Sequence, residues 1–257
     1  MKNHLLLAYE FAKRDLKGKY VGTSLGQLWI VLSPLVMIFI YTVIFSDFMK
    51  AKLDIIDNTY AYSIHLVPGL LAWTAFSNII MRLNISFFEK AGLIKKINVP
   101  MWVFQLSIVL VELFTFIISI LLALVFLILV HQPIGFSFLW LVPLMILQTL
   151  FAFALGVIFS LFTPFFKDMK EIIPIIFQLW FWMTPIIYLK DMLDHKYPFI
   201  LTYNPFYYFV EIYQNIFLFS KLPGNNFFLV IVLLTFGSLF IAGWLYKRMI
   251  TTIKDII

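Results

Sequence analysis

Apolar residues dominate long stretches of this chain, and the longest stretch carries no formal charge. Residues 113–166 include no Asp, Glu, Lys or Arg over 54 consecutive positions. A helix rises about 1.5 Å per residue and a bilayer span needs roughly 20 apolar residues, so this stretch is long enough for two helices. The segment 131–135 (HQPIG) lies near its centre and supplies the turn between them. The pattern therefore predicts a polytopic membrane protein.

Six charge-poor segments have the length and composition of membrane-spanning helices. They lie at residues 26–46, 62–82, 101–130, 137–163, 172–189 and 226–246. The third and fourth are longer than a bilayer requires, so we expect them to tilt or to extend beyond it. The predicted fold class is an all-α polytopic membrane protein, with residues 1–257 forming a single transmembrane domain.

Residues 1–25 are predicted to form an amphipathic helix on the membrane surface, ahead of the spans at 26–189. Apolar side chains recur there at helical spacing, at Leu5, Tyr9, Ala12, Leu16 and Tyr20. Three basic side chains lie off that face, at Lys13, Arg14 and Lys17. The first apolar run is too short for a signal peptide, and charges follow it immediately.

Residues 190–225 connect the fifth span to the sixth, but they do not fit a simple loop. The sixth span begins the final segment, residues 226–257. Ten aromatic residues fall within positions 197–219, interrupted by two prolines and one glutamate. The segment is too apolar for water and too broken to span the bilayer. Irregular backbone at membrane depth is tolerated only where it is buried in protein or lines a cavity. We therefore predict re-entrant helices in the external leaflet; the alternative is an aromatic belt at the lipid interface.

Charge and composition agree with this reading. The chain is 63% hydrophobic and 12% charged, whereas soluble domains carry about 25% charged residues. With both termini in the cytosol, 14 of the 19 Lys and Arg residues lie in cytosolic segments and 5 lie outside, as the positive-inside rule favours. The basic residues are spread over short loops, so nucleic acid is not expected as a partner. The absence of Cys excludes disulfides and thiolate metal sites.

No catalytic constellation emerges from the sequence. There is no G-x-x-x-x-G-K-[ST] motif, so the chain itself is not expected to cradle ATP phosphates. Four isolated histidines are interpreted as interfacial or loop residues and not as metal ligands: His4, His65, His131 and His195. Glu112 is the one acid within a span, and an ionisable group at that depth suggests function. The alternative is a shallower Glu112, hydrogen-bonded to a neighbour such as Gln105 or Ser119.

Aromatic side chains in the spans are the other candidates for substrate contact, because flat rings stack on sugars without fixed hydrogen bonds. The candidates are Tyr41, Trp73, Trp180, Trp182 and Tyr188. For each of them, helix packing or interface anchoring is the alternative. The cytosolic segment 82–100 is amphipathic; it either lies on the membrane surface or acts as a lever that docks into a soluble partner.

Four stretches together resemble the membrane subunits of type-2 ABC exporters for polysaccharides and teichoic acids. They are RDLK at 14–17 with Tyr20, SLG at 24–26, Trp29 and PL at 34–35; GLIKKI at 92–97 with Pro100; FKD at 166–168 through TPIIY at 184–188; and NP at 204–205 with Glu211 and Tyr213. They occur in the family's order and cover most of the chain. Met101, Lys167 and Gln214 stand where the family often has Arg. Met101 and Gln214 lack the charge that such contacts need, whereas Lys167 keeps the charge without the bidentate geometry.

The resemblance implies that two copies of the chain pair and that two ABC ATPase subunits bind their cytosolic face. ATP and magnesium would then be held by the partner ATPase, with no cofactor on this chain. The pair would enclose a channel for a lipid-linked glycan in a bacterial inner membrane. The residues implied in ATPase coupling are Arg14, Asp15, Lys17, Glu89, Lys90, Lys95 and Lys96. The residues implied in an external gate are Tyr203, Pro205, Tyr207, Tyr208 and Glu211.

Two other functions are compatible with the same sequence features. One is a type-2 ABC exporter of a small amphiphile, drug or lipid, which neighbouring resistance genes would favour over glycosyltransferase genes. The other is an integral-membrane acyltransferase acting on lipid-linked sugars. That enzyme would need a clustered His, Asp or Glu site facing one leaflet, and the sequence shows no such cluster.

Overall fold

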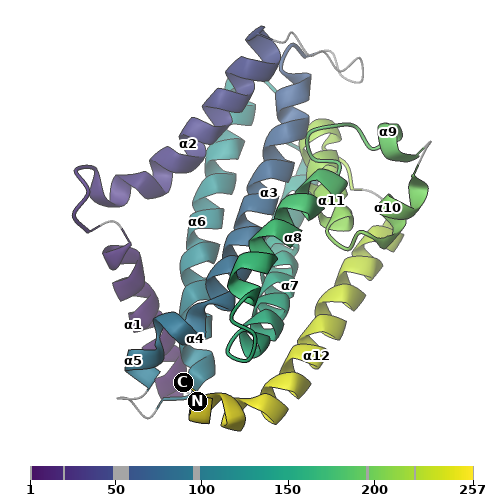
Figure 1. Ribbon diagram of the computed structural model, residues 1–257. Helices are drawn as coiled ribbons and strands as arrows, with labels where there is room; N and C mark the ends of the chain where they lie inside the picture. Colours follow the sequence, from purple (N-terminus) through teal and green to yellow (C-terminus); the bar gives the residue numbers. More distant parts are fainter. Residues whose placement is uncertain are drawn as a thin grey trace.

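The computed structural model describes residues 2–19, 21–48, 58–94, 99–194, 197–222 and 224–256, and all their regular structure is helical (Figure 1). The longer helices are α1 (Lys2–Gly18), α2 (Trp29–Thr42), α3 (Ala61–Asn84), α6 (Met101–Leu129), α7 (Leu141–Phe162), α8 (Met169–Met183), α11 (Tyr207–Phe219) and α12 (Asn225–Ile256). The shorter segments are η1 (Gly26–Leu28), η2 (Val43–Phe48), α4 (Ser86–Glu89), α5 (Ala91–Ile94), η3 (Phe136–Trp140), α9 (Asp191–Asp194) and α10 (Pro198–Tyr203).

Five helical segments within the described residues are long and apolar enough to cross a membrane. They are Gly26–Phe45, Ala61–Asn84, Met101–Leu129, Phe136–Phe162 and Asn226–Ile253. Five of the six predicted spans are thus helices of sufficient length. The longest helix, α12, has 32 residues, or about 48 Å, which exceeds the bilayer core of about 30 Å.

The expected fifth span at 172–189 is not one continuous helix. Helix α8 has 15 residues, a length of about 22 Å, which falls short of the bilayer core. It ends at Met183 because Thr184 precedes Pro185 and takes an extended conformation, with φ −102° and ψ 128°. A residue before proline is driven out of the helical region by the proline ring, and this effect outweighs the apolar pattern that continues to residue 189.

The chain nevertheless returns from one end of the bundle to the other between α7 and α12. At the lower end of Figure 1, where both termini lie, α3 ends and α8 begins. There the Asn84 amide, in the last residue of α3, donates to the carbonyl of Met169, the first residue of α8. At the other end the Ser220 hydroxyl donates to the Pro133 carbonyl in the α6–η3 turn, at 2.7 Å. The segment from α8 to α11 therefore runs from one end of the bundle to the other, a distance that a single long helix covers in the other crossings.

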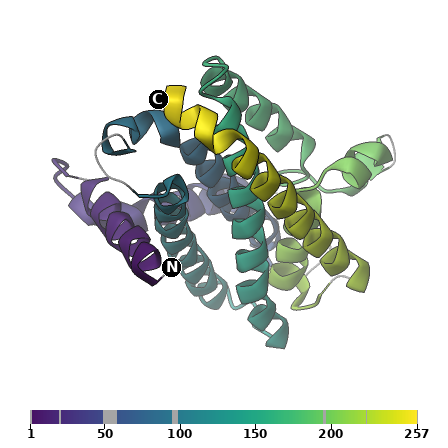
Figure 2. The same cartoon turned by 90° about the horizontal axis from the view of Figure 1, so that it is seen from below.

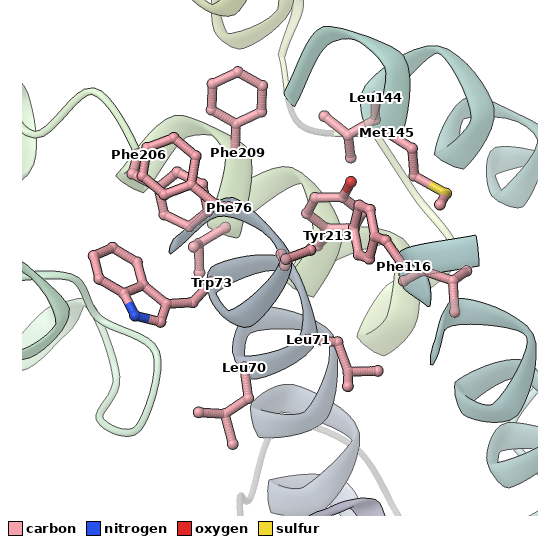
Figure 3. Packing of buried hydrophobic residues seen from close by; sticks show 14 of the residues in the cluster. Leu70, Leu71, Trp73, Phe76, Phe116, Leu144, Met145, Phe206, Phe209 and Tyr213 are labelled. Atoms are coloured by element: carbon pink, nitrogen blue, oxygen red, sulfur yellow. The ribbon is translucent and has the colours of Figure 1, made fainter. Parts of the chain in front are cut away.

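Helix α3 is the centre of the bundle and the most buried of the five long segments. It packs against α2, α6, α7, α8 and α11. Figure 3 shows Trp73 and Phe76 of α3 near Phe206, the residue directly before α11: the Phe76 and Phe206 ring centroids lie 4.2 Å apart, and those of Trp73 and Phe206 lie 5.2 Å apart. The aromatic segment of the sequence thus contributes a buried helix, α11, that packs against α3.

The N-terminal helix α1 lies beside the first half of α6, as the view from below shows (Figure 2). Ala8 and Ala12 are buried, while Leu5 and Tyr9 are 50% and 56% exposed. The predicted apolar stripe is therefore divided, because only its alanine-containing edge contacts α6. The stacked Phe11 and Phe104 rings, with centroids 5.1 Å apart, complete the contact.

Replacing Gly156 by Ala should destabilise the bundle by about 1–3 kcal/mol, the usual range for overpacking. A Cβ at Gly156 would lie 2.5 Å from Leu83 Cδ1 and 2.8 Å from Leu83 Cβ, where α7 crosses α3. Gly237→Ala is the matched control, because a Cβ there meets no atom within 4 Å. Thermal unfolding in detergent should show a lower midpoint for Gly156→Ala alone; equal midpoints would contradict the close crossing.

Candidate functional site

A network of charged side chains joins α1 to α3 and α6. Its innermost member is Glu112 on α6, whose side chain is 2% exposed. One carboxylate oxygen, Oε1, accepts hydrogen bonds from Arg82 Nη1 at 2.7 Å and from Lys19 Nζ at 3.2 Å. A buried carboxylate needs such partners, because burying an unpaired charge costs several kcal/mol. Glu112 is therefore paired with cations from two other segments.

Asp15 on α1 is the second acid of the network. It pairs with Arg82 Nη2 and, at 3.5 Å, with Lys90 Nζ. Partial burial alone would raise the pKa of Asp15, but the hydrogen bonds and positive charges of Arg82 and Lys90 outweigh it and hold the pKa below its ordinary value. This stabilisation is present above the ordinary pKa and is lost only as the pH falls through the lowered one. Asp15 therefore stays charged at neutral pH.

Arg82 is the centre of this network because one guanidinium contacts both acids. Its planar fork donates to Asp15 through Nη2 and to Glu112 through Nη1, a geometry that lysine cannot supply. The network connects the N-terminal helix, the end of α3, the middle of α6 and, through Lys90, the connection between α4 and α5. Movement of α1 or α5 would therefore change the charge environment of Glu112.

The expected local partners of Glu112 are not the observed ones. Gln105 donates to the Ser160 hydroxyl at 2.8 Å, and the Ser119 hydroxyl donates to the Thr115 carbonyl at 2.9 Å. Sequence reasoning missed Arg82 and Lys19 as partners, because both are distant in the chain. The one sequence feature that could have indicated them is their position along the chain, because Arg82 and Lys19 are both cations close to the end of a predicted span.

The other residues predicted to couple to an ATPase lie around this network. Arg14, Lys17 and Glu89 are exposed, whereas Lys90 takes part in the pairing with Asp15. These exposed side chains are available for contact with another protein. Lys95 and Lys96 lie outside the described residues.

The aromatic candidates divide into packed and accessible side chains. Trp73 is 8% exposed and packs against Trp180 and Phe206, which leaves it little surface for stacking on a substrate. Trp182 is 57% exposed. Tyr41 is half-buried and stacks on Phe45, with ring centroids 6.1 Å apart, so it too retains some free surface.

Asn204 is a buried residue that links several segments. The sequence pattern had indicated it only as part of the NP motif at 204–205. Its Oδ1 accepts from Trp180 Nε1 at 2.8 Å and from backbone N–H groups at the start of α11. Its Nδ2 donates to the Thr184 hydroxyl at 2.8 Å. One side chain thus joins the end of α8, the extended segment after it and the beginning of α11.

The predicted gate residues are grouped near this connection but are not equally accessible. Tyr203 is 83% exposed, whereas Tyr207 is buried. Pro205 and Tyr208 flank the start of α11, where the Tyr208 hydroxyl donates to a carbonyl of α10 at 2.9 Å. Glu211 is 6% exposed and forms an ion pair with Lys190. Tyr188 contacts the end of α8, since its hydroxyl donates to the Trp182 carbonyl at 2.7 Å.

Comparison with protein families identifies the class to which this architecture belongs. The model of the ABC-2 type transporter family matches residues 8–218, which include the ion network, the broken α8–α11 segment and all the spans except the last. The chain belongs to the ABC-2 type transporter family of membrane proteins. It is therefore a multi-pass transport subunit.

Curated relatives of this ABC-2 family member carry a more specific name. The chain is 33% identical over 193 residues to the O-antigen export system permease protein RfbA of Klebsiella pneumoniae, covering 75% of this chain and 72% of the relative. It is 26% identical over 219 residues to the protein of the same name from Myxococcus xanthus, covering 84% and 82%. Both alignments extend over most of each chain.

The three departures from the family pattern occupy different environments in this transporter. Met101 is buried at the first position of α6, and Lys167 is exposed in the turn before α8. Gln214 is buried, and its Nε2 lies 3.2 Å from the Pro185 carbonyl and 3.3 Å from His65 Nε2. At this position a neutral amide satisfies the local hydrogen bonds without an added charge. His65, expected at an interface or in a loop, is instead buried within α3.

Arg82→Gln should destabilise the protein by about 3–5 kcal/mol, because it removes a partner of buried Glu112 and leaves that charge undercompensated. Adding Glu112→Gln should restore part of the loss, since the buried charge is then gone. Arg14→Gln is the control and should stay within about 0.5 kcal/mol of the parent, because Arg14 is exposed. Denaturant titration of the purified protein measures all three. Equal stability of Arg82→Gln and Arg14→Gln would rule out the network as a structural link.

Proposed function

We propose that this chain is the permease half of an ATP-driven exporter that moves a lipid-linked polysaccharide, of O-antigen or teichoic-acid type, out of the cytosol. The observation that carries the proposal is the combination of the family match over residues 8–218 with relatives named as O-antigen export permeases. The alignments span most of each chain, so the resemblance involves the whole transmembrane architecture and not a local motif.

ATP hydrolysis is assigned to separate ABC ATPase chains. The sequence lacks a phosphate-cradling Walker A motif, so ATP and magnesium would bind to the partner. The charged surface formed by α1 and α4–α5 is the proposed contact for that partner. The Asp15–Arg82–Glu112 network gives a physical route from this surface into the membrane domain.

Six membrane crossings are proposed, with the fifth made by α8 and the segment after it. Both termini would then lie in the cytosol of a bacterium whose inner membrane holds the protein, in agreement with the Lys and Arg distribution. Non-helical backbone at this depth is tolerated because it is buried: Thr184 and Ile186 are almost fully covered by the rest of the chain. Helices α9–α11 would form the external gate.

Two copies of the chain are proposed to enclose the channel. Helix α8 supports this arrangement because most of its apolar side chains face outward, including Ile175, Leu179 and Trp182, each more than half exposed. This face would adjoin the channel, the second copy or the surrounding lipid. Trp182, Tyr41 and Tyr188 are the aromatic residues that retain free surface for a glycan.

The decisive experiment reconstitutes this chain with its co-encoded ABC ATPase in lipid nanodiscs. Added lipid-linked glycan should increase ATP hydrolysis, because a transporter couples the two processes. Deleting the gene should leave the glycan in the cytosol, which antibody labelling of intact and permeabilised cells can measure. Absence of a complex, or of any response to glycan, would refute the proposal; a response to small amphiphiles alone would favour a drug or lipid exporter.

The double charge reversal Arg14→Glu, Lys17→Glu should weaken binding of the ATPase roughly three- to tenfold, as expected for the loss of several exposed charge contacts. Membrane insertion should be unchanged, because both side chains are exposed. Lys221→Glu, at the opposite end of the bundle, serves as the control. Titration of the ATPase onto the reconstituted permease measures the effect. Unaltered binding would show that α1 is not a docking surface.

A further inference from the structure

A cavity lies between α2, α3 and α6, next to the ion network. Its volume is about 270 Å³, enough for several water molecules. Lys19 and Glu112 form one end of it. The remaining polar lining consists of Ser33, Thr74, Asn78, Thr115 and Ser119. Polar side chains gathered on three apolar helices are costly in lipid, so such a cluster indicates a functional site.

The lining repeats at helical spacing. Thr74 and Asn78 are four residues apart on α3, and Thr115 and Ser119 are four residues apart on α6. Residues four apart lie on the same face of a helix, so both helices direct a polar stripe toward α2. Asn78 is exposed although most of α3 is buried, and this places its amide at the cavity surface.

The hydrogen bonds already made by the cavity hydroxyls determine which ligand fits. Three of them donate to backbone carbonyls of their own helix: Thr74 to Leu70 at 2.7 Å, Thr115 to Val111 at 3.1 Å and Ser119 to Thr115 at 2.9 Å. While these bonds are kept, each hydroxyl proton is used and the oxygen is left to accept a hydrogen bond from a ligand. The Glu112 carboxylate is also an acceptor. The cavity therefore suits a ligand that donates several hydrogen bonds.

We propose that this cavity binds a sugar unit of the transported glycan, an inference that rests on the proposed function and names a site for it. Sugar hydroxyls donate hydrogen bonds to the threonine, serine and carboxylate oxygens and accept them from Lys19 and Asn78. A fully ionised phosphate group only accepts, so it could pair with Lys19 and Asn78 but not with the threonine, serine and carboxylate oxygens. The apolar part of the cavity surface can cover the C–H faces of a sugar ring; it is formed by Pro34, Met37, Leu71, Ala75 and Phe116.

The location joins this sugar site to the coupling surface. Glu112 lines the cavity and also accepts from Arg82, which bonds Asp15 on α1. Asp15 in turn lines a second cavity, of about 260 Å³, together with Arg14 and Lys90. Occupation of the sugar site would therefore be sensed at the proposed ATPase surface through a single arginine.

A labelling experiment tests the site directly, because the chain contains no cysteine. Ser33→Cys places a single thiol at the cavity, and Lys221→Cys places one at the far end of the bundle as a control. The assembled transporter in nanodiscs is treated with maleimide, with or without lipid-linked glycan isolated from cells that carry it. Glycan should slow labelling of Ser33→Cys about fivefold or more and leave Lys221→Cys unchanged.

Hydroxyl deletion then tests which contacts hold the sugar. Thr115→Val with Ser119→Ala, in the Ser33→Cys background, should raise the glycan concentration that half-protects the thiol about tenfold, as expected for two lost hydrogen bonds. Thr42→Val is the matched control, because the Thr42 hydroxyl also donates to its own helix, at 2.7 Å, but lies outside the cavity. If the double variant does not fold, Asn78→Ala offers another test, because it removes a proposed contact to the sugar at an exposed position.

The outcomes separate this site from the proposed function. Equal protection by a polyprenyl pyrophosphate without sugar would overturn the sugar assignment in favour of the lipid phosphate. Glycan-stimulated ATP hydrolysis without protection of Ser33→Cys would overturn the site and leave the function in place. Protection without any glycan effect on ATP hydrolysis or export would retain the sugar site and overturn the function.

Discussion

The structure depends on pairing one buried carboxylate with cations inside a largely apolar bundle. Glu112 is almost fully buried, so its charge must be balanced by nearby cations. Arg82 and Lys19 supply that balance from segments far away in sequence. Because Arg82 also binds Asp15, the N-terminal helix is attached to the membrane helices by charge as well as by packing.

This attachment places the charged surface of α1 and α4–α5 next to the polar cavity between α2, α3 and α6. The two features share the network as a common wall, with Asp15 on one side and Glu112 on the other. A polar side chain at this depth is expensive unless it contacts another polar group. The clustering of hydroxyls, an amide and an ion pair in one place therefore gives the permease a hydrophilic region without exposing it along the rest of the bundle.

The return path between α8 and α12 follows a second constraint. Thr184 cannot remain helical before Pro185, so the chain must complete the distance with extended backbone and short helices. The released backbone groups are accommodated because Asn204 bonds the end of α8 and the start of α11, while α11 packs on α3 and Phe206, directly before it, stacks on Phe76. Proline stereochemistry thus produces the irregular region, and burial against α3 makes it stable.

The sequence by itself determined the membrane class, the positions of five long helices and the family resemblance, because apolar periodicity acts locally; it did not predict the break before Pro185. It also singled out Glu112, although with the wrong partners. Only the tertiary structure decided that Arg82 and Lys19 pair with Glu112, that Trp73 is packed while Trp182 is accessible, and that polar stripes of two helices meet at one cavity. The physical reason is that these contacts join residues from separate helices, and their distances are set by helix packing, which no local pattern encodes.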